Sequence, residues 1–310
     1  MEFLIAPDRL ELADAVRDFL SGTHGPEVLR QLDTQGNRDQ AIWQSLVEMG
    51  LTGLIVPEEH GGLGLKLLDA VLIARECGRV CLAEPLVEAA FVRAPWLMAQ
   101  GKVDALEAIA SGEDKTTPAH NINGWQTDGE GEAIDSIDPL RNLTALPADT
   151  SDDPHLLDLG ALMASAQLIG SGEAMLDQAI EYAKIREQFG QPIGGFQAIK
   201  HKLADVAVAL EFARPVLLRA AQAMDDGIAS RSLHVSHAKL AATDAAYLSA
   251  ESAIQVHGAM GYTYEVDLHF WMKRTWALAG AWGGKGFHQR RVDDAIIGGT
   301  HITGPQHTFA

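Results

Sequence analysis

The segment Ile185-Arg-Glu-Gln-Phe-Gly-Gln-Pro-Ile-Gly-Gly-Phe-Gln197 lies between two long stretches with helical periodicity. It contains four residues that break helices and favour turns: Gly190, Pro192, Gly194 and Gly195. We therefore expect two helices joined by a hairpin, with Arg186 where the first helix ends. A guanidinium in that position can bind a phosphate through a forked pair of hydrogen bonds. The alternative is an ordinary turn between two core helices with a surface arginine.

The hydrophobic pattern predicts that helices make up most of the C-terminal half. Apolar residues recur at helical spacing over 156–189, 196–226, 231–257, 268–281 and 285–297. Long helices with short connections predict a bundle. Pro215 should kink the second of these helices, because its nitrogen has no hydrogen to donate to the helical ladder.

Two other regions precede the bundle. Helical spacing covers 7–20, 41–49, 67–80 and 85–100, whereas the composition between 101 and 154 shifts toward Gly, Asp, Glu, Thr and Pro. Only a few short strands fit this second region. The sequence thus predicts a mainly α protein with three parts: an N-terminal helical domain (1–100), a truncated middle β region (101–154) and a C-terminal four-helix bundle (155–310).

Composition and charge limit the functions that this chain can have. With 310 residues, 47% of them hydrophobic, it can bury a substantial core. The net charge of -18 argues against nucleic acid and anionic membranes as partners, because most of the surface would repel phosphate. No signal-peptide pattern or membrane-length apolar run is present, so we expect a cytoplasmic protein. Cys77 and Cys81 lack a metal-binding pattern and should be buried thiols, with no metal site.

A second glycine-bearing turn, Gln255-Val-His-Gly-Ala-Met-Gly-Tyr262, ends the third helix of the predicted bundle. The amide of Gln255 and the exposed backbone N–H groups could contact a nucleotide. The alternative is a simple helix cap at Gly258. We expect His257 to cap or pack rather than to act as an acid or base.

Three motifs in this order resemble the acyl-CoA dehydrogenase family. They are Val56-Pro-Glu-Glu-His-Gly-Gly-Leu-Gly64, Arg186-Glu-Gln-Phe-Gly190 with Phe196-Gln197, and Gln255-Val-His-Gly-Ala-Met-Gly-Tyr262. The resemblance implies a β-barrel-like middle domain between two helical domains, a dimer of dimers, and an FAD that lies across each dimer interface. It also implies an acyl-CoA substrate and an electron-transferring flavoprotein as electron acceptor. The residues that it assigns to FAD are Arg186, Gln188, Phe196, Gln197, Gln255 and Gly258, with Arg186 on the pyrophosphate.

The sequence departs from the family at both positions known to carry the catalytic base. In the family a Glu removes the α proton while the β hydrogen leaves as hydride to the flavin, which requires a carboxylate beside the α carbon. Alignment through Met272-Lys-Arg-Thr-Trp276 places Trp282 at the usual base position. Some relatives carry the base in an Asp-x-Glu-Arg motif, which here reads Asp158-Leu-Gly-Ala161, so Gly160 replaces the Glu. We therefore predict no catalytic residue in this chain.

Asp158 is the nearest carboxylate to these two positions. It could act as a substitute base, but it should point to another side of the helix than Gly160. An acidic residue near a helix N-terminus, where it stabilises the helix dipole, is the interpretation that we favour.

The middle region is also much shorter than the family requires. Trp125-Gln-Thr127 is at most a remnant of the strand that contacts the flavin ring, so we do not expect this chain to hold an isoalloxazine ring alone.

Three hypotheses for the function follow. The first hypothesis is that the chain is the non-catalytic subunit of an α2β2 acyl-CoA dehydrogenase, whose larger partner carries the base, as in enzymes for steroid side-chain CoA esters. The second is a self-sufficient flavoenzyme with an unrecognised base, and the third is a flavin-free helical interaction scaffold.

Overall fold

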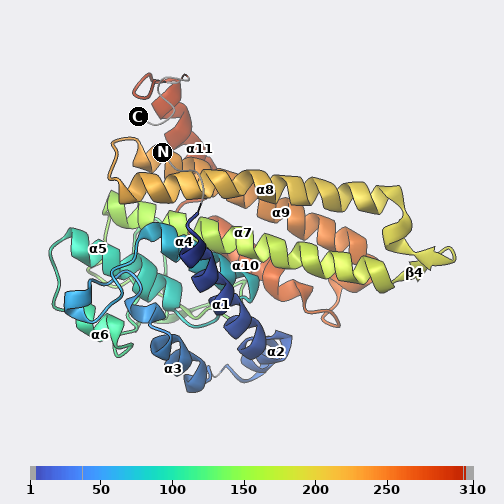
Figure 1. Cartoon of the computed structure of the whole chain (residues 1–310), viewed down its shortest axis with the longest axis horizontal. Coiled ribbons are helices and arrows are strands. Elements are labelled where there is room, and N and C mark those ends of the chain that lie inside the picture. Colours follow the sequence, from blue (N-terminus) through green and yellow to red (C-terminus); the bar gives the residue numbers. More distant parts are fainter. Residues whose placement is uncertain (1–4, 37, 303, 305–310) are drawn as a thin grey trace.

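A bundle of long helices forms the C-terminal half of the molecule (Figure 1). The computed structural model describes residues 5–36, 38–302 and 304. The bundle contains α7 (Pro154–Ile185), α8 (Gln197–Asp225), α9 (Arg231–His257), α10 (Leu268–Gly280) and α11 (Lys285–Ile296). The predicted mainly helical fold with a C-terminal bundle is confirmed. Helix α8 continues through Pro215, and α7 ends at Ile185 rather than at the expected residue 189, because a hairpin begins there.

Shorter helices make up the N-terminal part and pack on one side of the bundle (Figure 1). They are α1 (Pro7–Thr23), α2 (Pro26–Gln35), α3 (Gln40–Glu48), α4 (Leu67–Arg79), the π-helical turn η3 (Val87–Arg93), α5 (Ala94–Ala99) and α6 (Leu106–Ala110), with short 3-10 turns at η1 (Leu51–Gly53) and η2 (Glu58–His60). The side chain of Asp39 caps α3 by accepting from the Ala41 N–H at 2.8 Å. Cys77 and Cys81 are fully buried, as predicted, and burial raises the pKa of both thiols.

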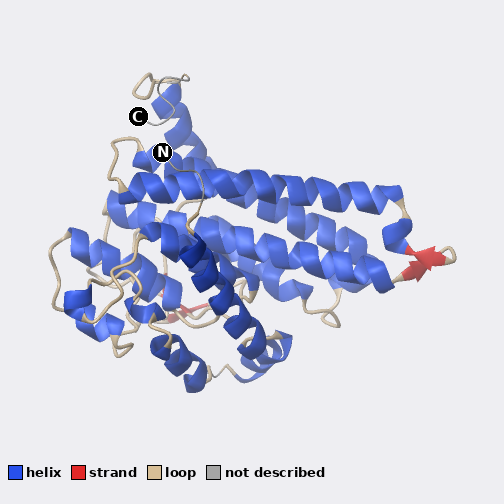
Figure 2. Cartoon of the chain, viewed as in Figure 1, coloured by secondary structure: helices blue, strands red, loops and turns tan. Residues whose placement is uncertain are grey.

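Strands are few and short (Figure 2). The strands β1 (Gln126–Thr127), β2 (Ala133–Ile134) and β3 (Leu143–Thr144) form an antiparallel sheet in the order β1-β3-β2. Gln126 and Ala133 both lie opposite Thr144. This sheet agrees with the few short strands expected in the middle region, although α6 was not foreseen. The boundaries at 100 and 154 remain predictions.

A two-stranded hairpin projects from one end of the bundle (Figure 2). It consists of β4 (Glu187–Gln188) and β5 (Gln191–Pro192), followed by the 3-10 turn η4 (Ile193–Gly195). Phe189 and Gly190 form the turn with φ of 54° and 81°, as two-residue hairpin loops require. The chain reversal predicted between the two helices is therefore present, and it is tighter than a simple loop.

Helix α7 is the centre of the molecule, and α4 crosses it closely. Every residue of α7 from Leu156 to Met175 is buried. A Cβ atom on Gly170 would lie 1.9 Å from the Arg75 carbonyl oxygen, and one on Gly78 would lie 2.2 Å from the Gln167 carbonyl oxygen. Both distances are far below van der Waals contact, so this approach of the two backbones requires glycine at both positions.

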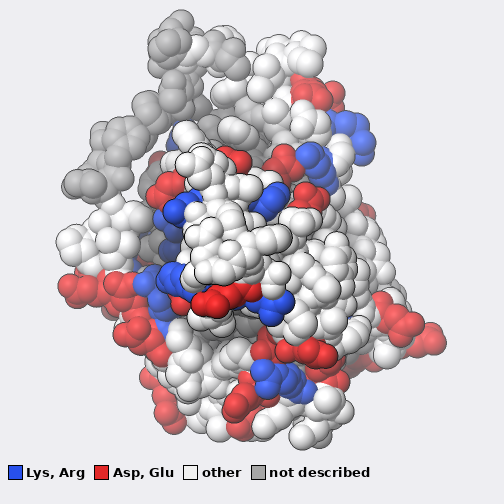
Figure 3. Space-filling view, turned by 90° about the vertical axis from the view of Figure 1, so that its right-hand side faces the viewer, with Lys and Arg blue, Asp and Glu red and all other residues white. Residues whose placement is uncertain are grey.

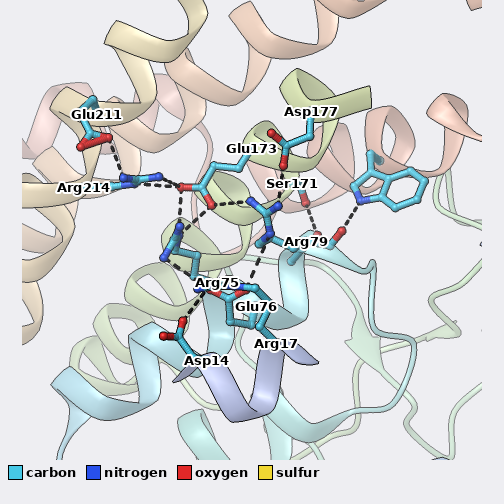
Figure 4. A network of polar contacts seen from close by, with 12 residues as sticks. Asp14, Arg17, Arg75, Glu76, Arg79, Ser171, Glu173, Asp177, Glu211 and Arg214 are labelled. Carbon is cyan, nitrogen blue, oxygen red and sulfur yellow. Dashed lines mark hydrogen bonds and ion pairs between the residues drawn. The ribbon is translucent and has the colours of Figure 1, made fainter. Parts of the chain in front are cut away.

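Ion pairs to two buried carboxylates, those of Glu76 and Glu173, hold the N-terminal helices on the bundle (Figure 4). The carboxylate of Glu173 on α7 accepts from Arg75 at 2.8 Å, Arg79 at 3.2 Å and Arg214 of α8 at 2.7 Å. Glu76 of α4 accepts from Arg17 of α1 at 2.9 Å. Four helices therefore share one network. Among the described residues, no helix is long and apolar enough to cross a membrane.

We expect Glu173→Gln to lower the free energy of unfolding by roughly 2–4 kcal/mol, because it leaves three partly buried guanidinium groups without their counter-charge. Burial acts to raise the pKa of Glu173, but the charges of Arg75 and Arg214 outweigh it and hold that pKa below its ordinary value. The stabilisation that the Glu173 carboxylate provides is therefore present at neutral pH and is lost as the pH falls below about 4. Urea denaturation at pH 7 and pH 3 measures both effects.

The control is Glu211→Gln, which breaks an exposed pair with Arg214 and should cost less than about 1 kcal/mol. Equal losses of unfolding free energy in the two variants would show that the pairs of the buried Glu173 stabilise the fold no more than the exposed pair does.

Candidate functional site

The structure brings the two predicted turns to the same end of the bundle (Figure 1). The Tyr182 ring on α7 stacks on the His257 ring at the end of α9, with centroids 4.3 Å apart. Ile254 of α9 and Ile193 beside the hairpin pack on the same cluster of buried residues. His257 is 7% exposed, and its Nδ1 lies 2.8 Å from the Ala253 carbonyl oxygen. It thus has the packing role predicted for it.

The six residues predicted to contact FAD surround this end. Arg186 follows the last residue of α7, Gln188 lies in β4, Phe196 caps α8 and Gln197 begins it, Gln255 lies near the end of α9, and Gly258 follows that helix with φ of 60°. All of them except the half-buried Phe196 and Gly258 are exposed. In the described part of the chain, no hydrogen bond or ion pair engages the side chains of Arg186, Gln188, Gln197 or Gln255. Their donors face outward.

The surface at this end is largely uncharged at its centre, with charges of both signs around it (Figure 3). Large apolar side chains are exposed here: Ile185 is 78% exposed, Phe189 93% and Tyr262 80%. Such a group of exposed apolar residues is typical of a surface that contacts another molecule. The overall charge of -18 is therefore not spread evenly over the molecule.

Gly160 and Trp282, the two positions predicted to correspond to the family's base positions, are in direct contact. A Cβ atom on Gly160 would lie 2.1 to 2.4 Å from three ring carbons of Trp282. The indole therefore occupies the space that a side chain at position 160 would need. Trp282 itself is 4% exposed, so this locus is filled by an apolar ring and has no carboxylate.

The backbone around Trp282 is held by residues that are distant in the sequence. Its N–H donates to Asn123 Oδ1 at 2.6 Å, and its carbonyl oxygen accepts from His288 Nε2 at 2.9 Å. Trp282 has φ of 58°, which is uncommon for a bulky residue. The His120 ring meets the indole edge-on at 6.3 Å. The sequence pattern did not indicate Asn123, His120 or His288, because their roles depend on long-range packing.

Asp158 is engaged on both carboxylate oxygens. Arg291 donates to Oδ1 at 2.8 Å, and the Ser232 hydroxyl donates to Oδ2. The residue is 1% exposed, and Asp153, not Asp158, caps α7 by accepting from the His155 N–H at 2.9 Å. Asp158 therefore links α7 to α9 and α11, in place of the helix-terminal role expected for it.

Comparison with known proteins defines the family. The N-terminal domain of acyl-CoA dehydrogenases matches residues 6–103, and their C-terminal domain matches residues 155–293. The acyl-CoA dehydrogenase IpdE2 of Mycobacterium tuberculosis is 31% identical over 293 residues, which cover 86% of this chain and 90% of IpdE2. The chain therefore belongs to the acyl-CoA dehydrogenase family, whose members are FAD-dependent oxidoreductases.

Two solved structures show the same fold. A structure of the ChsE4-ChsE5 complex from Mycobacterium tuberculosis superposes with a TM-score of 0.81 at 22% identity, covering 96% of this chain and 99% of that one. A steroid ACAD (acyl-CoA dehydrogenase), Tcur3481-Tcur3483, superposes with a TM-score of 0.81 at 23% identity, covering 95% of this chain and 99% of that one.

The exposed polar side chains at this end of the bundle have chemistry that suits the diphosphate and adenosine half of FAD. The outward-facing Arg186 and the exposed amides suit a diphosphate and an adenosine. The hydroxyl of Thr127 accepts from Arg141 at 2.8 Å, and the Arg141 guanidinium lies 5.1 Å from the Trp125 ring centroid. The suspected remnant of the flavin strand thus makes its contacts within this chain.

We expect acid to loosen the segment around Trp282 through His288. Burial, followed by the charge of Lys239, lowers the pKa of His288 to about 4, whereas an unfolded histidine has a pKa of about 6.5. The unfolded state then binds more protons, so stability falls as the pH drops from about 6.5 toward 4. From pH 7 to pH 5 the loss through this residue is about 2 kcal/mol.

Thermal melts of the wild type and of His288→Gln at both pH values measure this contribution. The variant should lose less stability on acidification than the wild type does. His201→Gln, which changes an exposed histidine of α8, is the control and should follow the wild type. An unchanged pH dependence in His288→Gln would refute the role given to this ring.

Proposed function

We propose that this chain is the non-catalytic subunit of a heteromeric acyl-CoA dehydrogenase. One observation carries the proposal: the Trp282 indole fills the space beside Gly160, so neither family base position holds a carboxylate. A base must reach the α proton of the acyl group to remove it. A larger acyl-CoA dehydrogenase subunit that carries the Glu base would supply that step in an α2β2 assembly.

The role that we propose for this chain is to hold the diphosphate and adenosine half of the partner's FAD. Arg186, Gln188, Gln197 and Gln255 present donors outward from the end of the bundle, and Phe196 and Gly258 shape the two turns. These residues would hold FAD, and the bound cofactor would supply a hydride acceptor for the β hydrogen, with an electron-transferring flavoprotein as the electron acceptor of the complex. This chain's residues bind and orient the cofactor and do not move the proton.

The exposed apolar residues of the same surface support a subunit contact there. Ile185, Phe189 and Tyr262 would be costly to leave in water. A partner that covers them would place its own flavin beside Arg186. The solved complex of two different chains, ChsE4-ChsE5, has this fold, which supports a heteromeric assembly for this chain as well.

The substrate class that we propose is the CoA ester of a steroid side chain. Its support is the structural likeness to a steroid ACAD. We place the protein in the cytoplasm, since CoA esters are formed and consumed there.

Visible absorbance in the flavin bands tests the subunit role. The chain should be colourless when expressed alone and should bind flavin when co-expressed with a larger acyl-CoA dehydrogenase subunit. Flavin together with acyl-CoA oxidation in the lone chain would instead identify a self-sufficient enzyme. A colourless product in both experiments would identify a flavin-free scaffold.

Within the complex, Arg186→Ala should weaken FAD retention roughly tenfold to a hundredfold, because it removes a charge-assisted contact to a phosphate. Dilution followed by measurement of free flavin gives the dissociation constant. Arg290→Ala is the matched control, since Arg290 is an exposed arginine on α11, away from the hairpin. Equal flavin loss in both variants would show that Arg186 does not contact the cofactor.

Trp282→Ala should lower the stability of this chain by roughly 3–5 kcal/mol through the cavity it leaves. It should leave the turnover rate per bound flavin unchanged, since the proton transfer belongs to the partner. Steady-state kinetics of the complex, normalised to flavin content, measures this. A lower rate per flavin would mean that Trp282 contacts the reacting substrate.

A further inference from the structure

Two stacked rings lie between the two turns of the proposed FAD site. Tyr182 belongs to the last turn of α7, four residues before Arg186, and His257 is the last residue of α9, two residues after Gln255. Their centroids are 4.3 Å apart and their planes differ by 27°. Neither ring is among the six residues predicted to contact FAD. The stack therefore joins the two turns and has no assigned role in binding.

Each ring is tied directly to the turn beside it. The Arg186 N–H donates to the Tyr182 carbonyl oxygen at 2.9 Å, at the point where α7 ends. On the other side, the 3-10 turn η5 (Gly258–Tyr262) folds back over His257. A Cβ atom on Gly261 would lie 3.1 Å from the His257 Cβ, so that turn is packed tightly against the histidine. A shift of either ring would therefore move the turn beside it.

The orientation of the His257 ring is fixed by a hydrogen bond. Nδ1 lies 2.8 Å from the Ala253 carbonyl oxygen, and Nδ1 must be the donor because a carbonyl oxygen can only accept. Burial lowers the pKa of His257, so the ring is neutral at neutral pH. The bond restricts rotation of the ring about its link to Cβ. An aliphatic side chain could fill the same space, but it would present no flat face to Tyr182.

The two turns that the stack joins must act on one ligand. Arg186 is assigned to the pyrophosphate and Gln255 to the adenosine side, and both side chains are exposed. Covalent bonds link these two groups in FAD, so their spacing in the ligand is limited. Two contacts to one ligand reinforce each other only when the geometry lets both form together. A fixed spacing between the turns therefore raises the affinity for the whole cofactor.

We propose that Tyr182 and His257 form a positioning pair, which fixes the spacing between Arg186 and Gln255 so that both contact one FAD. The pair acts through those two residues, and this inference rests on the proposed function. It follows that loss of the stack weakens FAD binding although every residue assigned to the cofactor is retained.

Dilution of the co-expressed complex, followed by measurement of free flavin, tests the pair. His257→Ala should raise the dissociation constant of FAD at least tenfold, because the two turns lose their common support. His257→Phe keeps a flat ring against Tyr182 and should stay within threefold of the wild type. Equal FAD affinity in the wild type and His257→Ala, or an equal loss in both variants, would overturn the inference.

A cycle of two substitutions distinguishes positioning from an independent effect. Arg186→Ala should weaken FAD binding in the wild-type background, and at least threefold less strongly in the His257→Ala background, because Arg186 no longer acts together with Gln255 there. The same weakening in both backgrounds would show that His257 and Arg186 act independently, which contradicts a positioning role.

Val235→Ala is the control for lost stability. Val235 is fully buried near the opposite end of α9 from His257. This variant should melt at a lower temperature than the wild type and keep its FAD affinity within threefold. A loss of affinity as large as that of His257→Ala would overturn the inference. A wild-type complex without flavin would refute the proposed function itself, whereas flavin held equally well by His257→Ala would refute only the positioning pair.

Discussion

Helices α4 and α7 cross with their backbones almost in contact, because neither Gly78 nor Gly170 carries a side chain at the crossing. This approach puts Arg75 and Arg79 of α4 beside the buried Glu173 of α7. The ion pairs and the close crossing therefore depend on each other. With α4 fixed on α7, the N-terminal helices lie in one place relative to the bundle (Figure 4).

The same central helix also determines how the residues around Trp282 pack. Six residues after the start of α7, Gly160 leaves space beside the helix, and the Trp282 ring takes that space. Asn123 and His288 hold the backbone of Trp282 from two other parts of the chain. A substitution that restored a carboxylate at position 160 would meet the indole first. The packing at this point therefore depends on glycine at position 160.

Much of the fold and part of the candidate site could be predicted from the sequence. Helical periodicity is a local property, so the bundle helices were placed within a few residues, and Gly190 with its neighbours indicated the reversal after Ile185. The contacts of Asp158 were not predictable, because Arg291 and Ser232 are distant in the sequence and meet it only after folding. The positive φ of Phe189, which forms the hairpin turn with Gly190, also had no clear sequence signal.

The sequence by itself determined the family, since its motifs need no coordinates. It also predicts that no carboxylate stands at the two positions where the family carries its base. Only the tertiary structure decided that Gly160 and Trp282 touch and that Arg186 and Gln255 share one end of the bundle. The physical reason is that each of these facts depends on side chains from separate elements. Their meeting is decided by how helices pack, and periodicity along one helix does not contain that information.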